Sequence, residues 1–161
     1  MNDKIISTVK LITSILLCEL IGVASALLSN IKDSSWFENL NKPSWNPPAY
    51  LFGPVWTLLY LCMGISLWLI WKSDHANLTK RKAILTFCIQ LSFNFFWSIL
   101  FFRFQNPFAA FILILLLLSA IILTMNFFYS ISKKAMWLLV PYLLWVCFAT
   151  ILNYFIWKLN I

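Results

Sequence analysis

A stripe of polar side chains runs along a segment that is otherwise rich in Leu, Ile, Phe and Trp. Its members stand four residues apart, on one face of a helix: Thr86, Gln90, Asn94 and Ser98. Amides are costly to leave unpaired in an apolar medium, so this face must contact protein or a cavity. Two interpretations stay open. The stripe either binds a neighbouring helix or supplies hydrogen-bond donors and acceptors to a ligand pocket.

Three further faces combine small, aromatic and polar residues at helical spacing. They consist of Tyr142, Trp145, Ala149 and Asn153; of Trp56, Tyr60 and Gly64; and of Gly22, Ser25, Ala26 and Ser29. Such faces suit a cavity for a flat, mostly apolar molecule that carries a few polar groups. Helix interfaces in membranes have a similar composition, so packing is the competing interpretation.

Conventional catalytic constellations are not apparent. The sequence shows no Ser/His/Asp set, metal-ligand cluster, glycine-rich phosphate loop or paired carboxylates, so neither hydrolytic or redox catalysis nor a bound metal or cofactor is expected. The cysteines share no ligand spacing and are expected to pack as small apolar residues: Cys18, Cys62, Cys88 and Cys147. The nine tryptophans leave one activity open, light-driven radical chemistry on a bound pigment, although tryptophans also gather at membrane interfaces.

The elements that position these residues are membrane helices. The 161 residues are 62% hydrophobic and 11% charged, whereas soluble domains are nearer about half apolar and a quarter charged. Charge-free runs of about 20 residues are long enough to cross the hydrocarbon as helices. We predict an all-α membrane protein, a single domain over 1–161 formed by a bundle of five transmembrane helices. The predicted spans are 5–28, 50–71, 83–103, 107–129 and 136–158.

The connection between the first two helices is the only long one. The stretch from Trp36 to Tyr60 holds four prolines and three tryptophans. It is therefore stiffer and more aromatic than an ordinary linker between two helices. Long loops in compact domains are often functional. We therefore expect Trp36–Ala49 to be a lid over a ligand cavity. Trp56 follows Pro54 inside the second helix and is expected to be part of the wall.

Prolines also mark helix boundaries. Pro54 is expected in the first turn of the second helix, and Asn106 is a plausible N-cap for a helix that begins at Pro107. The 103–106 link predicts a tight antiparallel connection. Pro141 either begins the regular part of the fifth helix or kinks it.

The net charge of +7 is distributed as a topology signal. With five spans, one side carries Lys4, Lys10, Lys72, Lys80, Arg81, Lys82, Lys133 and Lys134, and the other carries Lys32, Lys42, Arg103 and Lys158. This bias favours a cytoplasmic N-terminus in a plasma membrane, with the lid and the C-terminus outside. Nucleic-acid binding is not expected. A cleavable signal peptide is disfavoured for the first span because that span contains Glu19 and lacks a cleavage pattern.

Glu19 is the only acidic residue within a span. An intramembrane carboxyl is a functional candidate, either for binding a cationic group or for proton coupling. We favour a structural role, in which a protonated Glu19 hydrogen-bonds to a neighbouring helix, because no second ionisable group accompanies it.

Three blocks of sequence resemble the TspO/MBR family, the tryptophan-rich sensory proteins related to the mitochondrial translocator protein, or peripheral benzodiazepine receptor. The first block runs from Trp36 to Tyr60 and contains Lys42-Pro43, Pro47-Pro48 and Val55-Trp56-Thr57. The second contains Gln90-Leu91, Asn94, Trp97 and Ser98, and the third contains Pro141-Tyr142-Leu143, Trp145, Phe148-Ala149-Thr150 and Leu152-Asn153. Five helices and a length of 161 residues also agree with the family, so the resemblance covers essentially the whole chain. Tyr50 and Glu19 depart from the family pattern.

The resemblance implies a five-helix bundle, commonly a homodimer, whose cavity is closed by the loop between the first two helices. It implies binding of porphyrins such as protoporphyrin IX, as a ligand rather than a cofactor, and of benzodiazepine-type drugs. The matching ligand-binding positions are Trp45, Trp56, Tyr60, Asn94, Trp97, Tyr142, Trp145, Ala149 and Leu152. Trp56 and Trp145 match the tryptophans implicated in light-dependent porphyrin breakdown in some members.

The leading hypothesis is a membrane receptor or sensor for porphyrin-like ligands. The alternatives are a transporter of the same ligands and a light-dependent porphyrin-degrading protein. A coupled transporter is disfavoured because the five spans show no repeat symmetry. Leu152, Tyr154 and Lys158 match a spacing proposed for cholesterol contact, but that pattern is weak and sterol binding stays open.

Overall fold

The protein is a bundle of long helices. The computed structural model describes residues 2–30, 35–74 and 77–161. His75, the one histidine, which the sequence places in a polar loop, lies outside the described residues. The long helices are α1 (Asn2–Leu28), α3 (Ala49–Trp71), α4 (Asn77–Ser98), α5 (Pro107–Ile131) and α7 (Val140–Leu159). The short ones are α2 (Ser35–Asn39), the π-helical turn η2 (Ile99–Arg103) and α6 (Lys133–Leu138).

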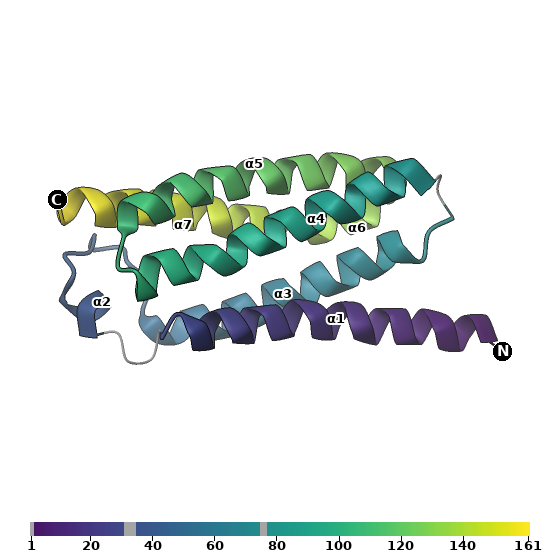
Figure 1. Cartoon of the computed structure of the whole chain (residues 1–161), viewed down its shortest axis with the longest axis horizontal. Helices are drawn as coiled ribbons and strands as arrows, with labels where there is room; N and C mark the ends of the chain where they lie inside the picture. Colours follow the sequence, from purple (N-terminus) through teal and green to yellow (C-terminus); the bar gives the residue numbers. More distant parts are fainter. Residues whose placement is uncertain (1, 31–34, 75–76) are drawn as a thin grey trace.

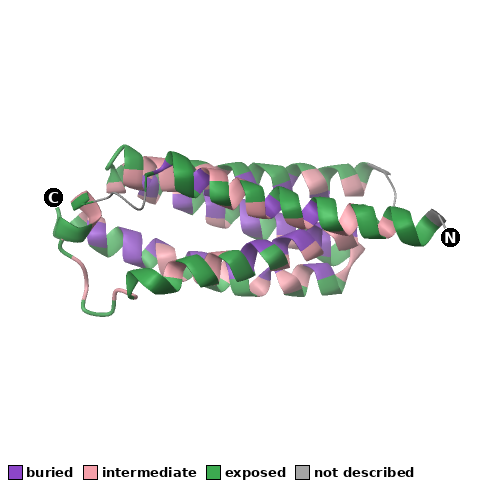
Figure 2. Ribbon diagram, turned by 90° about the horizontal axis from the view of Figure 1, so that it is seen from below, coloured by how far each residue is buried: buried purple, intermediate pink, exposed green. Residues whose placement is uncertain are grey.

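Five helical segments are long and apolar enough to cross a membrane, which confirms the predicted five-helix membrane fold. They are Asp3–Leu28, Ala49–Trp71, Leu78–Arg103, Pro107–Ile131 and Lys133–Leu159. Helices are the form expected here because every backbone donor finds its acceptor within the same segment. The outer faces of these helices are coloured as exposed in Figure 2. Many large apolar residues are among the exposed ones, as a lipid-facing surface requires.

Two boundaries differ from the predicted spans. The third segment was expected to start at residue 83, but α4 begins at Asn77, so the basic run Lys80-Arg81-Lys82 lies on a helix rather than in a loop. Lys and Arg are good helix formers, but the spans were predicted from charge-free runs, which exclude charged residues at a helix start. The fifth segment is interrupted at Leu139. Pro141, near the start of α7, therefore begins a new helix and resolves the alternative left open for it.

The other boundary residues behave largely as expected. The Asn106 side chain accepts a hydrogen bond from the Ala109 backbone N–H, and Pro107 opens α5. Pro54 lies inside α3, because the helix already begins at Ala49. The predicted lid begins within a short helix, since residues Ser35–Asn39 form α2.

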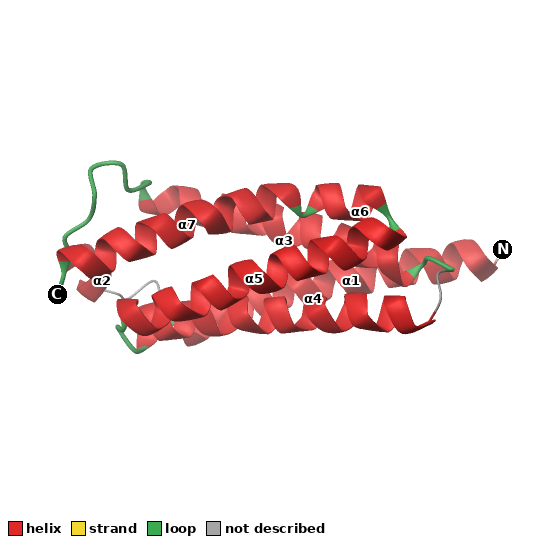
Figure 3. Cartoon of the chain, turned by 90° about the horizontal axis from the view of Figure 1, so that it is seen from above, coloured by secondary structure: helices red, strands yellow, loops and turns green. Residues whose placement is uncertain are grey.

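The helices form a ring in which neighbours in space are not always neighbours in sequence (Figures 1 and 3). α1 packs on α3 and α4, α4 packs on α5, and α5 packs on α6 and α7. α3 closes the ring through α6, whereas it touches α7 at few points. Figure 1 places α2, the 41–48 segment and the C-terminus at one end of the bundle, and the N-terminus at the other.

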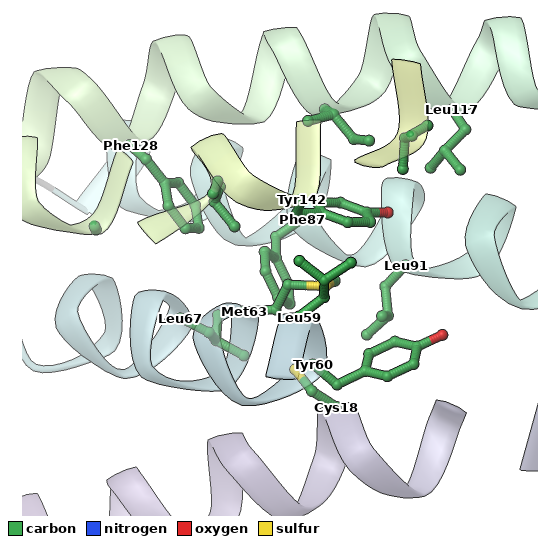
Figure 4. Close-up of a cluster of buried hydrophobic side chains, with 14 of the residues drawn as sticks. Cys18, Leu59, Tyr60, Met63, Leu67, Phe87, Leu91, Leu117, Phe128 and Tyr142 are labelled. Atoms are coloured by element: carbon green, nitrogen blue, oxygen red, sulfur yellow. The ribbon is translucent and has the colours of Figure 1, made fainter. Parts of the chain in front are cut away.

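The core lies along the inside of this ring. Buried side chains from α1, α3, α4, α5 and α7 meet in Figure 4, and the rings of Phe87 and Phe128 stack with centroids 5.8 Å apart. Lipid is as apolar as these side chains, so close packing rather than exclusion from water stabilises their association. Gly64 shows how tight it is: a Cβ there would lie 2.6 Å from the Cα of Ile15.

Candidate ligand-binding site

A chain of hydrogen bonds crosses the interior between three helices. The Tyr60 hydroxyl of α3 donates to Asn94 Oδ1 of α4 at 2.6 Å, and Asn94 Nδ2 donates to the Tyr142 hydroxyl of α7 at 3.1 Å. The Tyr142 hydroxyl donates in turn to Gln90 Oε1 at 2.8 Å. All four side chains are buried. Helical spacing had predicted each face separately, and the structure brings the faces together.

A second polar contact lies one turn farther along α4. Trp97 Nε1 donates to Asn153 Oδ1 at 3.0 Å, and Asn153 Nδ2 donates to the Pro107 carbonyl at 2.8 Å. These bonds join α4, α7 and the start of α5. The Trp97 indole N–H is therefore engaged by the protein, and its ring face is what remains for a ligand.

Two buried donors near the hydrogen-bond chain have no acceptor; the Ser14 hydroxyl on α1 is a third, outside this region. Trp145 Nε1 and Gln90 Nε2 are inaccessible and lack a hydrogen-bond partner. Most buried polar groups in proteins are paired, so each orphan calls for an explanation. A ligand or water that carries acceptor oxygens would satisfy both.

Aromatic rings form the walls beside these donors. Trp56 lies 5.6 Å from the Tyr60 ring and 6.4 Å from the Tyr142 ring, measured between centroids. Trp145 lies 5.8 Å from Phe52 and 5.5 Å from Phe148. Trp56 and the two tyrosines of the hydrogen-bond chain thus belong to one cluster.

The flap, defined here as residues 35–48, covers this end of the bundle. Trp36 and Phe37 meet Phe101 of the π-helical turn edge to face, with centroids 5.8 and 6.0 Å apart. π-Helical turns often occur at functional sites because they widen the helix and re-aim its side chains. Trp45 packs edge-on against Phe148 and Phe155 of α7. It is 43% exposed, so it holds the flap on α7 from outside rather than lining the interior.

Two asparagines latch the flap to the C-terminal end of α7. The Asn41 backbone N–H donates to Asn160 Oδ1 at 3.0 Å, and Asn160 Nδ2 donates to the Asn41 carbonyl at 2.9 Å. Asn41 Nδ2 also donates to the Leu159 carbonyl at 3.3 Å. Residues so far apart in sequence carry no pairing signal in one chain, so this latch was missed.

The void beneath the flap is small, about 30 Å³, close to the volume of one water. Ligand pockets are usually about 300–1,000 Å³, so the described conformation is closed. Its lining includes the predicted Trp97, Ala149 and Leu152 and also residues that sequence reasoning missed: Phe37, Phe52, Phe101, Phe102 and Ile156. The aromatic run around Phe101 was the one signal that could have indicated them.

Some predicted residues take no part in the site. The Thr86 hydroxyl donates to carbonyls of its own helix, so only the middle of the polar stripe faces the hydrogen-bond chain. Glu19 is half-buried on α1, and its carboxyl makes no hydrogen bond or ion pair with the described residues. The expected bond from Glu19 to a neighbouring helix is therefore not present in this structure.

Taken together, the five spanning helices, the buried polar chain and the aromatic flap define an integral, multi-pass membrane protein with a candidate site between its helices. The sequence matches the TspO/MBR family over residues 14–158. The chain belongs to this family.

Relatives extend over most of the chain. A "Tryptophan-rich protein TspO" of Archaeoglobus fulgidus is 44% identical over 94% of this chain and 97% of its own length. The human "Translocator protein" is 38% identical over 78% of this chain and 75% of its own length. A "Tryptophan-rich sensory protein" of Cereibacter sphaeroides is 32% identical over 81% of this chain and 80% of its own length.

Proposed function

We propose that this protein is a membrane receptor that binds porphyrin-like ligands between α3, α4 and α7, beneath the flap. The observation that carries the proposal is the orphaned Trp145 N–H set among Phe52, Phe148 and the buried chain of hydroxyls and amides. Aromatic walls suit a flat ring system, and an unpaired donor suits its carboxylate or carbonyl oxygens. The names of the sensory and translocator relatives agree with such a role.

Binding requires the flap to move, because the void of about 30 Å³ holds no porphyrin. The flap is attached by edge-on aromatic contacts and by the Asn41–Asn160 latch. Each such contact contributes on the order of 1 kcal/mol, so opening is accessible thermally. The closed conformation then protects the apolar site from water when no ligand is bound.

The setting of this receptor follows from the charge distribution. We place it in a plasma membrane with the N-terminus cytoplasmic, since the basic residues are concentrated at that end, and the flap therefore faces outward. We also propose that it acts as a homodimer, as the family resemblance implies. Cross-linking in native membranes and accessibility labelling of the flap would test both statements.

Protoporphyrin IX titration of the purified protein tests the ligand site, with the porphyrin absorbance band as readout. Trp145→Phe removes the orphaned donor and keeps the ring, and it should weaken binding about fivefold. Asn94→Leu breaks the hydrogen-bond chain at its centre and should weaken binding about tenfold or more, since it leaves the buried Tyr60 hydroxyl without an acceptor and removes the donor to the Tyr142 hydroxyl.

Matched controls separate the site from general effects. Trp137→Phe removes an exposed indole on α6, and Ser92→Leu makes α4 more apolar on its exposed face. Neither should change the affinity. Equal affinities in Trp145→Phe, Asn94→Leu and the wild type would refute the proposed pocket.

Light-dependent porphyrin breakdown is a second candidate, favoured by the placement of Trp56 and Trp145 in walls of the same region. Under illumination, loss of porphyrin absorbance should then slow in Trp56→Phe and in Trp145→Phe at saturating ligand. Breakdown at the wild-type rate in the double variant would exclude a specific role for these indoles.

A further inference from the structure

An open groove of about 240 Å³ lies on the outer surface where α5, α6 and α7 meet. Its lining residues are Ile122, Met125, Asn126, Tyr129, Met136 and Leu143. It is near the end of α5 that leads into α6, and Figure 1 places this end away from the flap. It is therefore separate from the site between α3, α4 and α7.

The chemistry of the groove changes in order along its length. Ile122, Asn126 and Tyr129 stand four and three residues apart on α5, so they follow one face of the helix toward its end. Lys133 comes next, with its Nζ 5.5 Å from the centroid of the Tyr129 ring. Lys133 and Met136 are three residues apart on α6 and share a face, which places the ammonium group at the mouth of the groove.

Asn126 is the member that packing does not explain. Its side chain is exposed on the lipid-facing surface and makes no hydrogen bond within the described part of the chain. It precedes the end of α5 at Ile131 by five residues, about 8 Å along the axis. The helix is about 37 Å long and the hydrocarbon about 30 Å thick, so Asn126 lies near the hydrocarbon boundary. An unpaired amide is costly there.

We propose that the groove binds one chain and the headgroup of an anionic glycerophospholipid. The acyl chain lies along Ile122 and Leu143, an ester oxygen accepts from the Asn126 amide, and the phosphate sits beside Lys133. Along the groove, the apolar wall, the Asn126 amide and the Lys133 ammonium follow in the same order as the acyl chain, the ester and the phosphate of such a lipid. The groove is smaller than the usual pockets of about 300–1,000 Å³, which fits one chain better than a ring system.

Charge complementarity selects an anionic headgroup over a zwitterionic one. A Lys near a membrane surface attracts anionic lipid by about fivefold in binding constant. Lys134 is adjacent in sequence but is two residues from Met136, so it lies on a different face of α6. It therefore contributes only to the general surface potential. The two lysines therefore make a matched pair for a test.

The experiment is native mass spectrometry of the purified full chain with equal amounts of dioleoyl-phosphatidylglycerol and dioleoyl-phosphatidylcholine. The wild type should retain phosphatidylglycerol preferentially. Lys133→Gln should reduce that retention about fivefold, and Lys134→Gln should change it less, although both remove one charge. Equal retention of the two lipids by the wild type, or equal losses in the two variants, would overturn the proposal.

A second pair of variants tests the groove itself. Ile122→Trp fills it, whereas Leu123→Trp places the same bulk on a neighbouring exposed position outside the lining. Ile122→Trp should lower retention of both lipids, and Leu123→Trp should not. Asn126→Leu should lower retention as well, because it removes the amide that donates to the ester oxygen.

Other occupants would be recognised by the same measurement. If Ile122→Trp abolishes a dimer mass and leaves lipid retention unchanged, a second copy covers the groove and the lipid proposal fails. If an equal amount of cholesterol displaces phosphatidylglycerol, the groove selects a neutral sterol and the proposal also fails.

Discussion

The interior of the bundle has two halves that share helices but differ in chemistry. Toward the N-terminal end, Met63, Ile70, Phe87 and Phe128 are fully buried and pack as apolar side chains. Toward the flap, α3, α4 and α7 instead contribute the chain of hydroxyls and amides, Trp56 and Trp145. Figure 4 shows the apolar cluster, with the Tyr60 and Tyr142 hydroxyls at one side of it.

The two halves differ in how closely their side chains pack and in how many buried donors lack a hydrogen-bond acceptor. In the apolar half, rings stack and the Ser66 hydroxyl donates to the Ala135 carbonyl at 2.7 Å. The polar half keeps the Gln90 and Trp145 donors without acceptors and a small void under the flap, whereas the apolar half has one unpaired hydroxyl, that of Ser14. Stability is therefore expected to depend mainly on the first half and ligand affinity mainly on the second. Three substitutions test this division.

Phe87→Ala should produce the largest effect, a loss of about 3–5 kcal/mol in the free energy of unfolding, because it opens a cavity against the stacked Phe128 ring. Thermal unfolding in detergent measures this, with Phe96→Ala on the exposed face of α4 as the control. Porphyrin affinity of the folded fraction should stay near the wild-type value. A folded Phe87→Ala protein that no longer binds porphyrin would break the proposed division.

Gly22→Ala should have an intermediate effect located in the polar half. A Cβ at Gly22 would lie 2.6 Å from Cδ2 of Tyr60, so the ring must shift and its bond to Asn94 is strained. Overpacking of this kind costs about 1–3 kcal/mol. Thermal unfolding and porphyrin titration should both respond. Gly53→Ala is the matched control, since no atom lies within 4 Å of its added Cβ; equal behaviour of the two variants would contradict the contact.

Asn160→Ala should give the smallest change in stability, about 0.5–1.5 kcal/mol, because it removes two hydrogen bonds of the exposed latch. Its main consequence should be kinetic. Stopped-flow measurements should show faster porphyrin association, and hydrogen exchange in residues 41–48 should accelerate. Asn39→Ala on α2 is the control; an unchanged association rate in Asn160→Ala would mean that the latch does not limit opening.

Much of the fold was predictable because membrane constraints act locally. Charge-free runs indicated four spans, and a run with Glu19 as its only charge between Lys10 and Lys32 indicated the first. Asn106-Pro107 marked the start of α5 through capping chemistry that involves only nearby residues. The start of α4 was misplaced by six residues, because charges that mark a membrane boundary do not mark the end of a helix. The break at Leu139 was left open for the same reason: a proline early in a helix is compatible with a start or a kink.

The candidate site divides in a similar way. Periodicity predicted that Tyr60, Asn94 and Tyr142 face inward, since i to i+4 spacing depends only on the helix itself. It did not show that they bond to one another, that Trp97 is engaged by Asn153, or that Trp45 packs on the outside of α7.

The sequence alone determined the class of protein, its five helices and the faces that point inward, because hydropathy and helical period are properties of consecutive residues. Tertiary structure decided the rest: the Asn41–Asn160 latch, the orphaned Trp145 donor and the groove between α5, α6 and α7. Each of these depends on the rotation and depth at which one helix packs against another. Those quantities arise from contacts between residues far apart in the chain, and no local pattern encodes them.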